Sequence, residues 1–528
     1  RTVGGLGQLW WTMAACVVVV PLLAGALPAF LAARRGVLPA LWTMVVFSGA
    51  GSLGLGARLL VYRSLRAADS GLGVLNGLEL VAAGVVGWSL LALGVAALLA
   101  GASCSSRLRW AAKCCEAAAE AAAAEGLAPP WGVVAAGAAV AQAAASLAWL
   151  ALLRAAASAA RLEWPAELPA TNARVAQAQA DEEAEVVPGG PVVRGLLRKP
   201  AFLCPIAPLL IASALLLRSV LCQLDALGRY LVAHITARWY FTDPAPASAP
   251  RSRRAGGRPV PAAVATVAGA HLGGVEACAL LHAATPSTAL RAAAVALHSE
   301  AAPWRRAERG GAFGAFAVAL GTGPCTQVAL FAGHFHLGAV RSTRALGSAL
   351  PAVQFLAGLP ALLEAAACAA AWLAAGCFVL LVRLGGQEQH DAGYVETQVG
   401  VGLLAGALAV APTCAWLMPV VAGFDALLEC AVVDDAHHGV PEDQAPLPGR
   451  WALDADASHA LWSSRHTPAP LRSLLFEAAQ TVQQDAARGA GRSTGSLLGA
   501  WSRWGGKRDD AGAYVPVGVG VPAGPDDD

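Results

Sequence analysis

The stretch FLCPIAPLLIASALLLRSVLCQLDALGRYLVAHITARWYF, residues 202–241, decides the fold class. It is apolar over most of its length. As a helix of about 40 residues it would extend about 60 Å, roughly twice the hydrocarbon thickness of a bilayer. Pro205 and Pro208 near its start, and Gly228 inside it, indicate where the membrane span begins or bends. We therefore predict a central membrane-spanning helix, with further helices before and after it.

The composition of the whole chain indicates a polytopic membrane protein. Of its 528 residues, 56% are hydrophobic and 14% are charged, and the mean hydropathy is +0.55. A chain this apolar cannot bury its hydrophobic surface in one water-soluble core. The net charge of +2 gives no broad basic surface for nucleic acid. The 12 cysteines lie mostly within apolar stretches and form no CxxC pair, so we predict no disulfide framework, metal or cofactor.

About nine apolar stretches are long enough to cross a bilayer as helices. Their approximate bounds are 9–33, 37–62, 74–102, 131–153, 202–241, 260–282, 311–334, 352–382 and 398–433. The predicted fold class is therefore an all-α transmembrane bundle that contacts membrane lipids.

Residues 107–125 have a different pattern from the spans around them. Arg109, Lys113, Glu116 and Glu120 recur every three or four positions, so they would line one face of a helix. We predict an amphipathic helix that lies on the membrane surface, and a solvated connector is the alternative.

Two polar segments lie outside the spans. Residues 155–200 contain an acidic cluster of the kind that is usually solvated. Residues 436–528 are polar and contain many prolines and glycines, which predicts a largely disordered tail with a short helix near 471–487. The predicted transmembrane domain accordingly covers residues 1–435.

Ionisable residues inside the spans are the candidates for function, because a charge at the bilayer centre costs about 3 kcal/mol on insertion scales. They are Glu79, Arg218, Asp225, His234, Glu276, Glu364, Asp425 and Glu429. A structural role is an alternative for each one. Arg218 and Asp225, for example, are seven residues apart and would lie near one helix face, where they could pair. Glu276 and the nearby His271 are the strongest candidates, since they lie mid-span beside two glycines.

Several short motifs occur along the chain in an informative order. A basic stretch and an amphipathic helix precede a proline-led span, and the central span ends on a Trp-Tyr pair. A His-x-Gly start, a Gly-x-x-x-Cys spacing and an acid followed by a cysteine come later. The residues concerned are Trp239, Tyr240, His271, Gly273, Gly321, Cys325, Asp425, Cys430 and Asp434. Over roughly residues 9–435, this order resembles the eukaryotic choline-transporter-like family, although RGGAF at 309–313 departs from the family's Asn-Arg-Asn-Ala-Tyr.

The resemblance implies a function and a topology. The family has ten spans, so we expect a first span before the start of this sequence. The C-terminal tail would be cytoplasmic, and the loop at 155–200 extracellular. The implied function is transport of choline or a related quaternary or primary amine across the plasma membrane, or an organellar membrane, of a eukaryotic cell.

Recognition of a quaternary ammonium places demands on the site, because this group has no N–H to donate. It is bound by aromatic faces within a negative field. The rings at or inside spans are Trp88, Trp239, Tyr240 and Trp416, which join His271 and Glu276 as predicted substrate contacts. The alternatives are a transport-inactive scaffold and a transporter of a different small solute. An intramembrane enzyme is disfavoured because the chain has no HExxH motif, and we predict no catalytic residue.

Adjacent helical residues point about 100° apart, so Trp239 and Tyr240 cannot both face one ligand. We interpret Tyr240 as lining the path and Trp239 as an interfacial anchor, although both could be anchors. Tyr240→Leu is expected to raise the apparent KM for choline about tenfold, because a desolvated cation–π contact contributes about 2 kcal/mol or less. Trp239→Leu should chiefly reduce the amount of protein at the membrane. Unchanged uptake per folded molecule in both variants would contradict this assignment.

Overall fold

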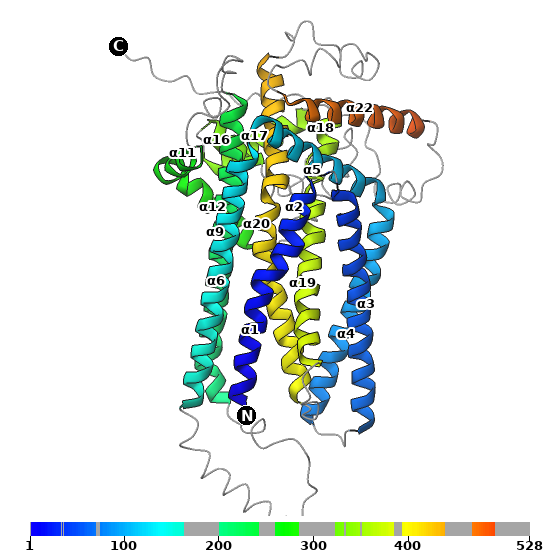
Figure 1. Ribbon diagram of the computed structural model, residues 1–528, viewed down its shortest axis with the longest axis vertical. Coiled ribbons are helices and arrows are strands. Elements are labelled where there is room, and N and C mark those ends of the chain that lie inside the picture. The colour runs from blue at the N-terminus through cyan, green and yellow to red at the C-terminus, as the bar shows by residue number, and fades with distance from the viewer. Residues whose placement is uncertain are drawn as a thin grey trace, which may run out of the picture. The chain divides into compact units, whose positions relative to one another are not determined.

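A computed structural model gives the arrangement of the chain. It describes residues 2–32, 34, 36–69, 74–162, 200–241, 259–284, 323–331, 334–348, 351–384, 393–438 and 467–490. All regular secondary structure in these ranges is helical (Figure 1), which confirms the predicted all-α class. The chain divides into two compact units, Arg1–Ala479 and Gln480–Asp528, and the first contains the helix bundle.

The elements follow one another in the order given below; the α labels are those of Figure 1, and η denotes a π-helix. They are α1 (Thr2–Pro21), η1 (Leu22–Ala26), α2 (Leu27–Ala32), α3 (Val37–Asp69), α4 (Val74–Ser103), α5 (Ser105–Glu125), α6 (Ala128–Leu162), α9 (Pro200–Tyr240), α11 (Pro259–Thr266), η2 (Val267–His271), α12 (Leu272–Ala284), α16 (Gly323–Phe331), α17 (Phe335–Ser348), α18 (Pro351–Leu356), α19 (Ala361–Leu384), α20 (Gly393–His438) and α22 (Ala469–Ala490).

Eight spans in the described residues are long and apolar enough to cross a membrane. They cover Trp11–Ala32, Val37–Val61, Gly84–Ser103, Ala128–Leu153, Ile211–Tyr240, Pro259–Ala283, Ala361–Val379 and Leu404–Asp434. Each overlaps one of the predicted stretches, and the chain is therefore an integral membrane protein of the polytopic class. The remaining predicted span, 311–334, lies partly outside the described residues, so the number nine stays a prediction.

Helix α20 is the axis of the bundle. Its span is 72% buried, against 22% to 56% for the other seven spans, and it contacts α1, α6, α9 and α19. Small residues allow this close packing. A Cβ added to Gly406 would lie 2.7 Å from the carbonyl oxygen of Trp372, which is closer than a side chain tolerates, so glycine lets α19 approach α20.

Helix α5 has the predicted amphipathic pattern. Arg109, Lys113 and Glu120 are exposed, while Trp110 and Cys114 are buried in the core. Glu116, the fourth member of the predicted polar stripe, is instead half-buried. Its Oε1 accepts a hydrogen bond of 3.3 Å from the backbone N–H of Val37, at the start of α3. A carboxylate at this position caps a helix N-terminus, so α5 also holds the N-terminal end of α3 in place.

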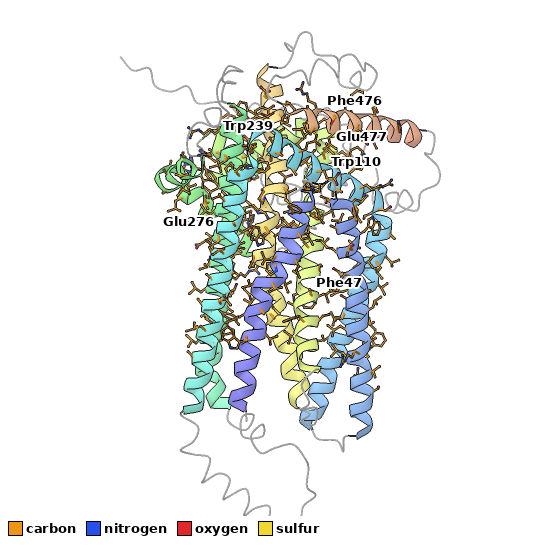
Figure 2. The ribbon with its side chains drawn as sticks, viewed as in Figure 1. Phe47, Trp110, Trp239, Glu276, Phe476 and Glu477 are labelled. Atoms are coloured by element: carbon orange, nitrogen blue, oxygen red, sulfur yellow. The ribbon has the colours of Figure 1, made fainter. Side chains whose placement is uncertain are left out.

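The short helix predicted near 471–487 is observed as α22, and its first half packs on the bundle. Leu471, Leu474, Leu475 and Ala478 are buried in the same core cluster as α5 and α9. Figure 2 labels Phe476 and Glu477 near Trp110, and Glu477 pairs with Lys113. Both members of this ion pair are about half exposed, so the apolar contacts contribute more to the packing than the pair does. The predicted domain boundary at 435/436 lies inside the first compact unit.

Cysteine labelling can test the orientation of α5. Cys114 and Cys115 are fully buried, and burial raises the pKa of both thiols well above the ordinary value. A cysteine introduced by Arg109→Cys, on the exposed face, should react with a maleimide at least about tenfold faster in the native protein than these two. Peptide mass spectrometry would give the three rates, and the denatured protein serves as control. Equal rates in the native state would contradict the amphipathic packing.

Candidate functional site

Four ionisable side chains meet in the interior of the bundle, between α9, α12 and α19. Asp225 and Arg229 lie one turn apart on α9, Glu364 lies in the first turn of α19, and His282 lies near the end of α12. Their exposed fractions are 5%, 4%, 3% and 2% in that order. Charged groups this deep in a membrane protein are stable only when they are paired.

Arg229 holds this cluster together. Its Nε donates to both carboxylate oxygens of Asp225, at 3.2 Å each, and its Nη2 donates to Oε1 of Glu364 at 2.6 Å. One guanidinium group thus connects α9 to α19 and is shared between two acids. The Nδ1 atom of His282 lies 3.5 Å from Oδ2 of Asp225. With a neutral imidazole, two carboxylates and one guanidinium leave the cluster with an excess of negative charge.

Two further buried acids lie toward the end of α20, and each is bound by a neighbouring element. Oε1 of Glu429 accepts a hydrogen bond of 2.6 Å from the Nε2 of Gln327 on α16. Asp434 accepts a bond of 3.2 Å from the hydroxyl of Tyr240, at the end of α9. The same hydroxyl lies 2.8 Å from the Oγ1 of Thr467, just before α22. Since the phenol has one hydrogen, Thr467 is the donor in the second bond.

Three aromatic side chains pack together between α9 and η2. Tyr230 follows Arg229 directly, and its ring stacks on His234 with 5.9 Å between centroids. His271 lies in the π-helix η2, and its ring centroid is 5.6 Å from that of Tyr230. The Tyr230 hydroxyl and the His234 Nδ1 are buried and have no hydrogen-bond partner in the described ranges. Single π-turns inside longer helices are frequent at functional sites.

The six predicted substrate contacts do not gather at one place. Tyr240 is buried, and the half-buried Trp239 meets its ring edge-on at 6.1 Å. His271 is buried beside Tyr230, as described above. Glu276 is exposed on the outer side of α12 (Figure 2). Trp88 is 62% exposed on α4, and Trp416 is half-buried where η1 crosses α20.

The predicted family-motif residues are mostly in the core. Cys325 is buried, with its Sγ 3.8 Å from the Sγ of Cys278, and Cys430 and Asp434 are buried on α20. Asp425 is half-buried and Gly273 is exposed. Gly321 lies outside the described residues. So does the side chain of Glu79, which the sequence also made a candidate.

Sequence reasoning missed two members of the cluster, Arg229 and His282. It offered a pair between Arg218 and Asp225, and the structure gives each of them another partner. The Nε of Arg218 donates to the backbone oxygen of Ala283 at 3.0 Å, while Asp225 pairs with Arg229. The i, i+4 spacing of Asp225 and Arg229 was visible in the sequence and is the favourable spacing for an ion pair on one helix. For His282, only its position at the end of a predicted span was visible.

The comparisons with known proteins give no further assignment. No protein-family model matches the chain, and a search of curated proteins gives no match. The resemblance to the choline-transporter-like family thus rests on the motifs given above and stays a prediction. Among the described residues, no group of three or more His, Cys, Asp and Glu side chains is arranged to hold a metal ion.

The shared guanidinium predicts a large stability effect. Arg229→Met would leave two buried carboxylates without their cation, which typically lowers the free energy of unfolding by about 3–5 kcal/mol. Arg238→Met, at the exposed end of the same helix, is the matched control and should change it by about 0.5 kcal/mol or less. Thermal unfolding of the purified proteins in detergent would measure both.

A compensating variant separates loss of charge balance from loss of packing. Adding Asp225→Asn and Glu364→Gln to Arg229→Met removes the uncompensated acids and should recover much of the lost stability. If Arg229→Met is as stable as Arg238→Met, the cluster is not what joins α9 to α19.

Proposed function

We propose that this chain transports choline or a related quaternary or primary amine across the plasma membrane, or an organellar membrane, of a eukaryotic cell. The observation that carries the proposal is the excess of acids inside the bundle. Asp225, Glu364, Glu429 and Asp434 are all buried, whereas Arg229 is the one buried Arg or Lys in the described part of the chain. Such an interior favours a positively charged solute over a neutral or negative one.

Dehydration opposes the entry of a cation into the bilayer. A cation that enters the bilayer loses its water, and a fixed negative field in a medium of low dielectric constant compensates for that loss. Quaternary ammonium groups also favour aromatic faces, since they donate no hydrogen bond. The rings of Tyr230, His234 and His271 contact one another inside the bundle, and together with the predicted Tyr240 contact they would supply such faces.

Transport also explains why the polar groups are in the bundle at all. A scaffold is stabilised by apolar packing and gains little from buried ion pairs, which are often no more stable than hydrophobic replacements. Ionisable residues inside membrane spans more commonly mark a solute or ion pathway. The two π-helices support the same view, because both lie within spans, η1 beside α20 and η2 beside Tyr230.

The test compares a cation with its neutral isostere. Purified protein in lipid vesicles should take up labelled choline in a saturable manner. Excess unlabelled choline should inhibit this uptake. The alcohol 3,3-dimethylbutan-1-ol has the same shape without the charge, and at equal concentration it should inhibit at least about tenfold less, because it gains nothing from the negative field.

Protein-free vesicles give the background for this measurement. Uptake no greater than that background would reject choline transport and favour a scaffold or a different solute. Equal inhibition by the alcohol would reject recognition of the positive charge, even if choline is taken up.

A further inference from the structure

Two polar side chains on α6 are buried and have no hydrogen-bond partner among the residues that the structure describes. Gln142 and Ser146 are both fully buried and lie one turn apart, so they occupy one helix face. Within the described part of the chain, neither the Oε1 nor the Nε2 of Gln142 has a hydrogen-bond partner, and neither has the Oγ of Ser146. Buried polar atoms in native proteins are nearly always satisfied, so three such atoms on one helix face are available to bind a polar group.

The depth of this face in the bundle follows from the packing of α6 against α9. A Cβ on Gly228 would lie 3.7 Å from the Cβ of Ala138, and the Nε1 of Trp149 donates to the Oγ of Ser213 at 3.2 Å. These two contacts show that the helices are antiparallel. Interpolating between them places Gln142 level with roughly residues 222–225, the turn of α9 that ends on Asp225.

The contact between α6 and α20 gives an independent estimate of the depth of Gln142. A Cβ on Gly423 would collide with the ring of Trp131, so α6 and α20 are in contact at these residues. Because the two helices run in opposite directions, Gln142 lies close to the level of Thr413. The backbone of Thr413 in turn contacts η1, since a Cβ on Gly25 would lie 2.8 Å from its carbonyl oxygen. Gln142, Asp225 and η1 therefore lie at about the same depth in the bundle, and Ser146 lies one turn further along α6.

We propose that Gln142 and Ser146 form the hydrogen-bonding subsite of the transport path and bind the hydroxyl group of a choline-like amino alcohol. This inference rests on the proposed function. A hydroxyl needs one acceptor and one donor, and the Gln142 amide offers both, while Ser146 adds a second group of either kind. The Asp225 carboxylate at about the depth of Gln142 balances the ammonium group, and the neutral amide recognises the other end of the solute.

The hydroxyl is the feature to vary in the test. Ethyltrimethylammonium is choline without its hydroxyl, so the ratio of the two KM values in vesicle uptake isolates the subsite. The wild-type protein should prefer choline about tenfold, because the analogue leaves the buried amide unsatisfied. Gln142→Leu should raise the KM for choline about tenfold, leave that for ethyltrimethylammonium unchanged, and bring the ratio close to one.

A matched control and a second variant separate failure of the subsite from failure of the proposed function. Gln223→Leu, an exposed glutamine on α9, is the matched control and should keep the wild-type ratio. If Gln142→Leu does not reach the membrane, Ser146→Ala must lower the ratio instead. A wild-type protein that transports both cations, with a ratio that neither variant changes, overturns the subsite, leaves the proposed function standing and assigns the three polar atoms to internal water. Wild-type transport of neither cation overturns the proposed function and the subsite with it.

Discussion

The sharing of one guanidinium between two carboxylates is the interaction on which the arrangement of the central helices depends. Arg229 donates to Asp225 within α9 and to Glu364 across to α19. In an apolar interior none of these charges is stable alone, so the three groups specify the position of two helices relative to each other. Apolar packing by itself is less specific, because alanine-rich faces fit together in many registers.

The sequence was sufficient for the fold class and for the positions of most spans. Long apolar stretches leave few alternatives, and eight of them are observed as candidate spans. The amphipathic helix α5 was predictable for the same reason, since its charges recur at helical spacing. Glu116 lies within that stripe but caps α3, and nothing in its spacing distinguishes it from its exposed neighbours. Local periodicity predicts a face, not the element that comes to lie beside it.

The cluster was less predictable because it is assembled from distant segments. Asp225 and Glu364 were candidates because they are ionisable residues inside apolar spans, but their common partner, Arg229, was not among the candidates. Gln142 attracted no attention because an uncharged amide in an alanine-rich helix is ordinary. Its amide atoms have no hydrogen-bond partner among the described residues, and this can be seen only once the neighbouring helices are in place.

The bond between Thr467 and Tyr240 has a consequence for how the protein could be regulated. Tyr240 lies about three turns beyond Arg229 on the same helix, and a helix transmits small displacements along its axis with little loss. Under the proposed function, a solute that shifted α9 at the level of Arg229 would change the affinity of this helix for the segment before α22. By thermodynamic reciprocity, anything that stabilises or removes that segment changes the affinity for the solute by the same factor.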